Sequence, residues 1–199
     1  MENLKKSIQI TVETYKAGNL NKAEEQAKDL IKKNPNVAFI YNLLGLILMS
    51  LKKNAEAIKV FEKGIKIDPT FAMIYNNLGL LYFNSKFENN ITKAEELYNK
   101  SISLNDKIAE PHTNLGNLKK YVNKIDDAIE CHKKALSINP NFSFSYLNLG
   151  NIYIEIGKFN EAKINIEKAI ELNSNLSIAH RTLSRLKKYK EGDIHINVL

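Results

Sequence analysis

One short phrase recurs along this chain, and its spacing constrains the fold more strongly than any other feature. The phrase occurs four times with variations: YNLLGLIL at 41–48, YNNLGLLYF at 75–83, HTNLGNL at 112–118 and YLNLGNIY at 146–153. Each copy holds a glycine at the same place: Gly45, Gly79, Gly116 and Gly150. Separations of 34, 37 and 34 residues between these glycines are typical of a stacked array of small structural units.

The repeat extends beyond these four copies. Steps of 34 residues outward reach Thr11 and Ser184, which follow Ile10 and Leu183 as each glycine follows a leucine. An alanine recurs in the second half of each unit: Ala23, Ala57, Ala94, Ala128 and Ala162. Four residues later stand Ala27, Phe61, Tyr98, His132 and Ile166. Three units end near a proline: Pro35, Pro69 and Pro140.

Each unit is predicted to form two helices, A and B. In the third unit Tyr75, Leu78, Gly79 and Tyr82 follow at i, i+3, i+4 and i+7, so they lie on one face of helix A. Glycine in helix A and alanine in helix B let the two backbones approach closely, and larger side chains fill the space beside them. A lone helix pair cannot bury its apolar face, so the units must stack on one another.

This pattern resembles the tetratricopeptide repeat, which has 34 residues and the motif W-x-x-L-G-x-x-Y, then A-x-x-x-F, then P. The resemblance covers about residues 4 to 190. The tryptophan position is filled by other residues: Tyr41, Tyr75, His112, Tyr146 and His180. The resemblance implies an all-α fold, a right-handed α-solenoid of stacked helix–turn–helix units with a C-terminal capping helix.

We expect one domain over residues 1–199. It comprises repeats at about 4–37, 38–71, 72–108, 109–142 and 143–176, a capping helix at 177–190 and a tail at 191–199. Three extra residues in the third repeat are expected to lengthen its A-to-B turn. Left-handed residues are predicted after helix A at Gly18, Asn123 and Gly157. N-caps of helix B are predicted at Asn21, Thr92, Asp126 and Asn160.

The sequence holds no phosphate-binding glycine loop, Cys-x-x-Cys, His-Glu-x-x-His or nucleophile elbow. His112, His132 and His180 occupy packing positions of the repeat, and Cys131 is the only cysteine. We therefore predict no enzyme activity, no metal and no cofactor. The absence of a signal peptide, of a long apolar run and of a possible internal disulfide favours a cytoplasmic protein without membrane contact.

The formal net charge is +7, and the basic residues are nearly all lysines. A compositional bias toward Lys, Asn and Ile accounts for this charge, and attraction to acidic partners is the functional alternative. A nucleic-acid-binding protein more often carries a continuous, arginine-rich basic stripe. We therefore predict no nucleic-acid partner.

Asparagines mark the candidate binding surface on the A helices, which line the concave side of such an array. With the glycine as repeat position 8, positions 6 and 9 hold Asn77, Asn114, Asn117, Asn148 and Asn151. A primary amide donates and accepts hydrogen bonds, as does an extended peptide backbone. The series is predicted to bind a peptide segment. The alternative is that these asparagines bond to one another between neighbouring helices.

Two other groups flank the asparagines. Position 2 holds the apolar Phe39, Met73 and Phe144, which either contact a partner or pack between repeats. On the capping helix Arg181 and Arg185, followed by Lys188, are candidates to receive an acidic side chain or a C-terminal carboxylate. A solvated cap is the alternative for these basic residues.

The phrase NLGN with asparagine at position 6 is similar to the repeats of O-linked N-acetylglucosamine transferase, which implies a peptide-binding asparagine series. Residues 179–196 resemble the junction in bacterial proteins whose repeats precede a sulfotransferase domain. We expect a non-catalytic interaction module that binds a protein or peptide partner, as a monomer or weak homo-oligomer. The alternatives are a substrate-recruiting arm of a glycosyl- or sulfotransferase system and a self-associating structural adaptor.

Overall fold

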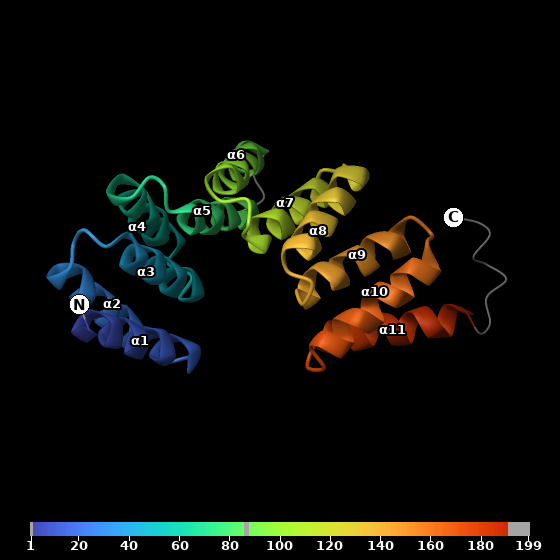
Figure 1. Cartoon of the computed structure of the whole chain (residues 1–199), viewed down its shortest axis with the longest axis horizontal. Coiled ribbons are helices and arrows are strands. Elements are labelled where there is room, and N and C mark those ends of the chain that lie inside the picture. The colour runs from blue at the N-terminus through green and yellow to red at the C-terminus, as the bar shows by residue number, and fades with distance from the viewer. Residues whose placement is uncertain (1, 86–87, 191–199) are drawn as a thin grey trace. The chain divides into compact units, whose positions relative to one another are not determined.

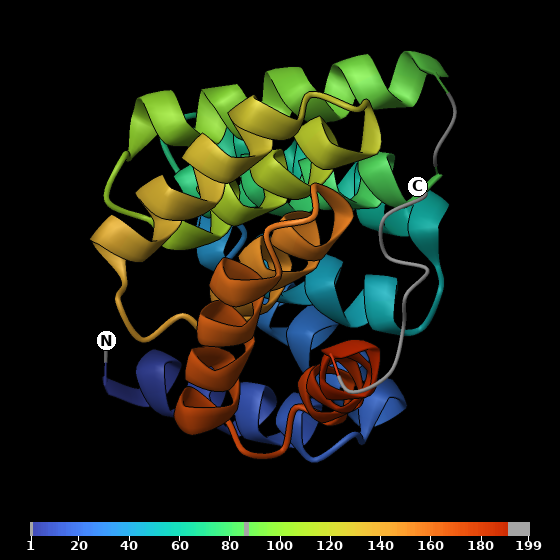
Figure 2. The ribbon, with the colours of Figure 1, turned by 90° about the vertical axis from the view of Figure 1, so that its right-hand side faces the viewer.

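The computed structural model describes residues 2–85 and 88–190, which form eleven α-helices and no strand. Coiled ribbons joined by short connections are seen in both views (Figure 1, Figure 2). The A helices are α1 (Glu2–Lys16), α3 (Ala38–Ser50), α5 (Ala72–Ser85), α7 (Ala109–Tyr121) and α9 (Ser143–Glu155), followed by the unpaired α11 (Ser177–Lys190). The B helices are α2 (Leu20–Lys33), α4 (Asn54–Ile67), α6 (Glu88–Leu104), α8 (Ile125–Ile138) and α10 (Phe159–Leu172).

The helices fall into two compact units, Met1–Asp106 with α1 to α6 and Lys107–Leu199 with α7 to α11. Within each unit an A helix packs on the B helix that follows it, and that B helix packs on the next A helix. The predicted all-α fold of stacked helix–turn–helix pairs is confirmed. A single domain over 1–199 stays a prediction, and its tail, 191–199, lies outside the described residues.

The glycine of helix A faces the larger side chain of helix B within the same repeat. A Cβ added to the glycine would come within 2.9 Å or less of that side chain in four pairs: Gly45 with Phe61, Gly79 with Tyr98, Gly116 with His132 and Gly150 with Ile166. The contact recurs at matching repeat positions. The recurring glycine is therefore a packing requirement, because any side chain there would separate the two helices.

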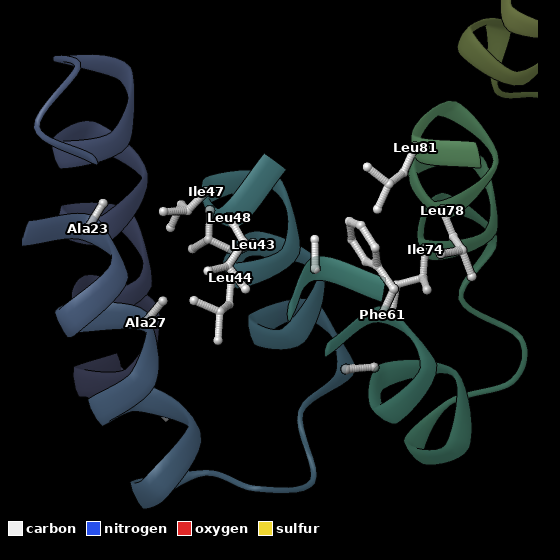
Figure 3. Packing of buried hydrophobic residues seen from close by; sticks show 12 residues of the cluster. Ala23, Ala27, Leu43, Leu44, Ile47, Leu48, Phe61, Ile74, Leu78 and Leu81 are labelled. Atoms are coloured by element: carbon white, nitrogen blue, oxygen red, sulfur yellow. The ribbon is translucent and has the colours of Figure 1, made fainter. Parts of the chain in front are cut away.

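Apolar side chains from successive helices form the core of each unit. In the first unit Ile47 of α3, Phe61 of α4 and Ile74 of α5 are completely buried and belong to one cluster (Figure 3). In the second unit Leu147 of α9, Ile166 of α10 and Leu186 of α11 form a corresponding cluster. Within each unit these apolar contacts extend from one helix pair to the helix that follows it, as the stacking argument requires.

Four of the turns from helix A to helix B contain a left-handed residue, and three of these residues were predicted. Gly18, Asn123 and Gly157 have φ of 80°, 61° and 76°, and Lys52 adopts the same conformation at 60° without a sequence signal. The next residue donates its N–H to a carbonyl five residues earlier, for example Lys53 to Leu48 at 2.9 Å. This is the hydrogen bond of a Schellman motif, which closes helix A.

The predicted N-caps are wrong. Helices α2, α8 and α10 begin one residue before Asn21, Asp126 and Asn160, and Thr92 lies inside α6. The cap positions hold Asn19, Lys53, Lys124 and Lys158, none of which makes a side-chain cap hydrogen bond. The Schellman turn explains the difference. Helix B starts two residues after the left-handed residue, so the turn fixes the cap position regardless of which side chain stands there.

The extra residues of the third repeat lengthen helix B rather than the turn. Helix α6 has 17 residues, whereas α4 and α8 each have 14. The prediction of a longer A-to-B turn is therefore wrong. The sequence ENNITKAEELYNK in α6 contains neither proline nor glycine, so the extra residues continue the helix.

Two kinds of hydrogen bond recur in the turns from helix B to the next helix A. The Tyr41 and Tyr75 hydroxyls donate to the Pro35 and Pro69 carbonyl oxygens at 2.9 and 3.0 Å. Asp68 Oδ1 accepts from the Thr70 hydroxyl at 2.6 Å and from the Thr70 backbone N–H at 2.9 Å, and these bonds lower the pKa of the Asp68 carboxyl. These bonds fix the direction in which the chain enters the next repeat.

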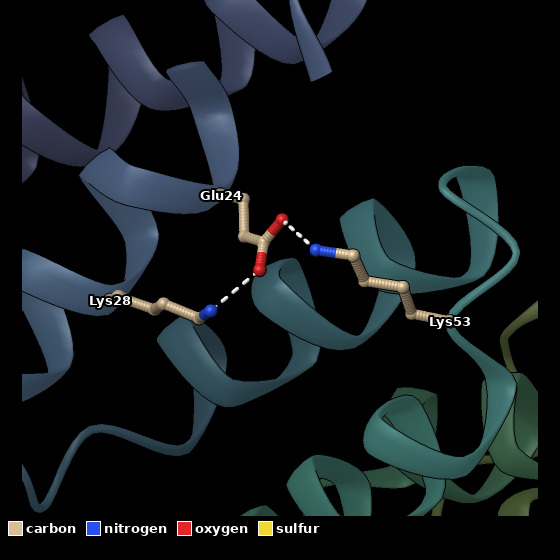
Figure 4. Close-up of polar contacts among 3 residues, drawn as sticks. All are labelled: Glu24, Lys28 and Lys53. Carbon is tan, nitrogen blue, oxygen red and sulfur yellow. Dashed lines mark hydrogen bonds and ion pairs between the residues drawn. The ribbon is translucent and has the colours of Figure 1, made fainter. Parts of the chain in front are cut away.

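One buried carboxylate ties two repeats of the first unit together. Glu24 of α2 accepts from Lys53, at the start of α4, at 2.7 Å and from Lys28 at 2.5 Å (Figure 4). Its side chain is 8% exposed, whereas both lysines are much more open to solvent. The hydrogen bonds from Lys28 and Lys53 lower the pKa of the Glu24 carboxyl, so it stays ionised although it is buried.

Candidate functional site

Polar contacts join helices α7 and α9 along their length. The Thr113 and Ser145 hydroxyls lie 2.6 Å apart, and both residues are buried. One turn further along α7, Asn148 Nδ2 donates to Asn117 Oδ1 at 2.8 Å. Near the helix ends Lys120 pairs with Glu155 at 2.9 Å. These contacts fix the register of the two A helices, which places the asparagines of the second unit side by side.

Three asparagines of the second unit, Asn117, Asn148 and Asn151, keep hydrogen-bonding capacity after these contacts. Asn117 and Asn148 are half-buried, and each uses only part of its amide in the bond between them. Asn151 is half-buried and makes no side-chain hydrogen bond with a described residue. Asn114 is half-buried on the same helix as Asn117. Free donors and acceptors therefore remain on Asn117, Asn148 and Asn151.

Asn77, in the first unit, is placed differently. Its side chain is 5% exposed, and its Nδ2 donates to Asn42 Oδ1 on α3 at 2.8 Å. Its own Oδ1 accepts from Asn76 Nδ2 at 3.2 Å. The amide is thus engaged within the stack, which matches the alternative of bonds between neighbouring helices at this residue. A role for Asn77 in binding stays a prediction.

Apolar side chains at repeat position 2 are open to solvent. Phe39 is 42% exposed, Phe144 51% and Ile178 54%. The Phe39 ring centroid lies 6.3 Å from that of Phe71, and the Phe142 and Phe144 centroids are 6.4 Å apart. Each phenylalanine thus rests against a second ring, with part of its surface available for contact.

The two arginines lie on the exposed side of α11. Arg181 and Arg185 are both exposed, and neither forms an ion pair or hydrogen bond with a residue that the structure describes. Ala179 and Leu186, on the opposite side of the helix, are buried in the core of the second unit. The side chain of Lys188 lies outside the described part of the chain.

The strongly shifted titratable groups lie in the core. Burial lowers the pKa of His132 to about 4 and raises the pKa of the Tyr98 hydroxyl. Both side chains are completely buried, and neither makes a hydrogen bond. Among the described residues no group of His, Cys, Asp and Glu could hold a metal ion, and no described helix is suited to span a membrane.

Sequence reasoning missed three residues that position the asparagines: Asn42, Thr113 and Ser145. The signal available in the sequence was that all three are polar residues on A helices. Their side chains are buried because each finds its partner on the neighbouring A helix, about one repeat away in sequence. A search for polar pairs between consecutive repeats would have found them.

Comparisons with known families agree with the repeat pattern. A model of the TPR repeat matches residues 45–86, and two models of the tetratricopeptide repeat match residues 109–142 and 145–176. Together these matches span more than half of the chain. No curated protein sequence matches the chain significantly.

Solved structures share the fold. A crystal structure of MamA is 27% identical, with a TM-score of 0.64, and the match covers 83% of this chain and 95% of that chain. TTC0263, a thermophilic TPR protein in Thermus thermophilus, is 17% identical with a TM-score of 0.81, covering 93% and 99%. YrrB, described as a TPR protein with an unusual peptide-binding site, is 16% identical with a TM-score of 0.60, covering 89% and 90%.

Proposed function

Since this chain is a tetratricopeptide-repeat protein, we propose that it is a non-catalytic interaction module that binds an extended segment of a partner protein along its A helices. Proteins built from this repeat generally bind protein partners. The observation that carries the proposal is the half-exposed amide pair of Asn117 and Asn148, which is held in register and retains free hydrogen-bonding groups.

The chemistry of this surface suits a peptide backbone. An extended chain presents N–H and C=O groups in alternation, and a primary amide can satisfy one of each. Asn117, Asn148 and Asn151 supply such amides on two consecutive A helices, and Asn114 remains a predicted member of this surface. Since they recognise the backbone, they set the path of the segment more than its sequence. The fold allows this use, as the peptide-binding site of YrrB illustrates for that protein.

The remaining residues extend the proposed surface. Arg181 and Arg185 contact the part of the segment that passes α11. In the first unit, Asn77 contacts a partner only if its bond to Asn42 is exchanged for one to that partner. The proposal also holds that the protein is cytoplasmic and is a monomer or a weak homo-oligomer. The transferase-recruiting arm and the self-associating adaptor stay predictions from the sequence.

The test is selection of peptides from a random library on the immobilised chain, followed by fluorescence anisotropy of a selected peptide. Asn151→Ala removes an amide without an internal hydrogen bond, so it leaves the melting temperature unchanged. We expect it to weaken binding several-fold, because one lost hydrogen bond costs about 1 kcal/mol. Asn148→Ala, which also breaks the bond to Asn117, weakens binding further.

The matched control is Asn165→Ala on the B helix α10, where the amide donates to the Glu161 carbonyl. This variant should bind as the unmodified chain does. Equal affinity of all four proteins for the selected peptide would refute the assignment of the asparagine surface. Failure to select any peptide would refute the proposed function as a whole.

A further inference from the structure

We propose that the segment bound by the second unit is an acidic peptide segment of a partner protein, with a carboxylate that lies against Arg181 and Arg185 and an apolar side chain next to it. This inference rests on the proposed function and adds the chemistry of the partner. It is carried by the position of the two arginines, the charge of the A helices and the exposed side chain of Ile178.

Arg181 and Arg185 are the only two arginines among the 29 basic residues of the sequence. They stand one helical turn apart on the exposed side of α11, and neither has a carboxylate partner among the described residues. A guanidinium is a planar fork of donors that matches a carboxylate in a bidentate pair, whereas a lysine acts as a point charge.

Most of the positive charge on the A helices of the second unit lies on α11. Helix α7 contains three charged residues, Glu110, Lys119 and Lys120, with a net charge of +1. Helix α9 contains one, Glu155, which is already paired with Lys120 of α7. Helix α11 has five basic residues and no acidic one in the segment SIAHRTLSRLKKYK. A segment that passes the exposed side of α11 therefore meets two guanidinium groups, Arg181 and Arg185, that have no acidic partner among the described residues.

An apolar contact accompanies the arginines. Ile178 is 54% exposed and stands three residues before Arg181, so both lie on one face of α11. Phe144 occupies the same repeat position on α9 and is 51% exposed. An apolar side chain of the bound segment removes this surface from water while its acidic neighbour pairs with a guanidinium. Electrostatic attraction speeds the encounter, and the apolar contact prolongs the complex.

The experiment compares two fluorescein-labelled peptides on the full chain by anisotropy, at about 50 mM salt where screening is weak. The acidic probe is SGDEIDDLEGSG, and the matched probe SGNQINNLQGSG replaces every carboxylate by its amide. We expect the acidic probe to bind about tenfold more tightly or better, with an affinity that falls as salt is raised.

The variants separate local recognition from net charge. Arg181→Gln with Arg185→Gln should weaken binding of the acidic probe about tenfold and bring it close to the amide probe. Lys133→Gln with Lys134→Gln removes the same charge from exposed positions on α8 and should change the affinity less than twofold. Ile178→Ser should weaken binding of both probes several-fold.

Three results overturn the inference: equal binding of the two probes, equal losses in the arginine and lysine variants, or tighter arginine-dependent binding of a single-stranded oligothymidine than of the acidic peptide. If the amide probe binds as well as the acidic one and Asn151→Ala weakens both, the proposed function stands and only the acidic partner is refuted. If neither probe binds, the acidic partner is refuted, and the library selection decides the proposed function separately.

Discussion

The ring of His132 on α8 lies directly over Gly116 on α7, where an added Cβ would be 2.9 Å from Nε2. The imidazole is completely buried, and both of its nitrogens lack a hydrogen-bond partner. The same place in two other repeats holds Phe61 and Tyr98, so His132 fills a position that also accepts aromatic rings. This relationship links the repeat pattern to the pH dependence of stability.

The stability of the second unit should fall on the acid side because of His132. Burial and the nearby Lys120 charge lower the pKa of His132 to about 4, whereas the unfolded chain binds this proton below its ordinary pKa of 6.5. Between these values the unfolded state holds more protons than the native state, so stability decreases as pH falls. The loss amounts to roughly 3 kcal/mol between pH 6.5 and 4.

His132→Phe should remove that dependence and stabilise the protein at neutral pH, since it also removes a buried polar group without a partner. Urea unfolding at pH 7 and pH 5 measures the effect. His180→Phe, at an exposed position, is the control and should keep the acid-side loss. The same acid-side slope in His132→Phe as in the unmodified chain would contradict this explanation.

Gly150→Ala should destabilise the second unit although alanine favours helix. The new Cβ would lie 2.5 Å from Ile166 Cγ1 and 3.3 Å from the Ala162 carbonyl oxygen. Overpacking exceeds the gain in helix propensity, and we expect a net loss of about 1–2 kcal/mol. The double variant Gly150→Ala with Ile166→Ala should lose less than the sum of the single losses in denaturant unfolding. Strict additivity would show that the two residues do not clash.

Tyr75→Phe should cost about 1 kcal/mol of unfolding free energy, because it removes the hydroxyl that donates to the Pro69 carbonyl oxygen. Tyr146 occupies the same repeat position, and its hydroxyl makes no hydrogen bond with a described residue. Tyr146→Phe is therefore the matched control and should leave the melting temperature nearly unchanged. Equal shifts in the two variants would mean that the bond to the proline carbonyl contributes nothing.

Glu24→Gln should destabilise the first unit, since it weakens the bonds from Lys28 and Lys53 that join α2 to the start of α4. Hydrogen bonds to a charged group are worth more than neutral ones, and we expect a loss of about 1–2 kcal/mol. The lowered pKa of Glu24 agrees with this expectation. The contribution of the ionised carboxylate to stability is present at neutral pH and is lost as acid protonates it.

The control for this variant is Asp29→Asn, which removes an ion pair with Lys33 on the same helix. Both side chains of that pair are more than half exposed, at 57% and 67%, so its loss should change stability little. Thermal unfolding of the two variants at pH 7 provides the measurement. A larger effect of Asp29→Asn than of Glu24→Gln would show that burial of Glu24 is irrelevant to its contribution.

Local chemistry explains which features of the fold were predictable. The left-handed turn residues follow from Gly18 and Gly157, because glycine adopts positive φ without strain. Lys52 takes the same conformation with no local preference for it, because the flanking helices of its repeat require the turn. The N-cap predictions failed for the same reason, since the Schellman turn and not the polar side chain sets where helix B begins.

The sequence by itself determined the helix pairs and the residues between them, because apolar periodicity, glycine and proline act within one repeat. Only the tertiary structure decided which asparagines are open to a partner. Asn77 bonds to Asn42, and Asn148 to Asn117, each across a full repeat of the chain. Whether an amide is consumed or free depends on the register of two stacked helices and on burial, and these are properties of contacts between repeats rather than of any single one.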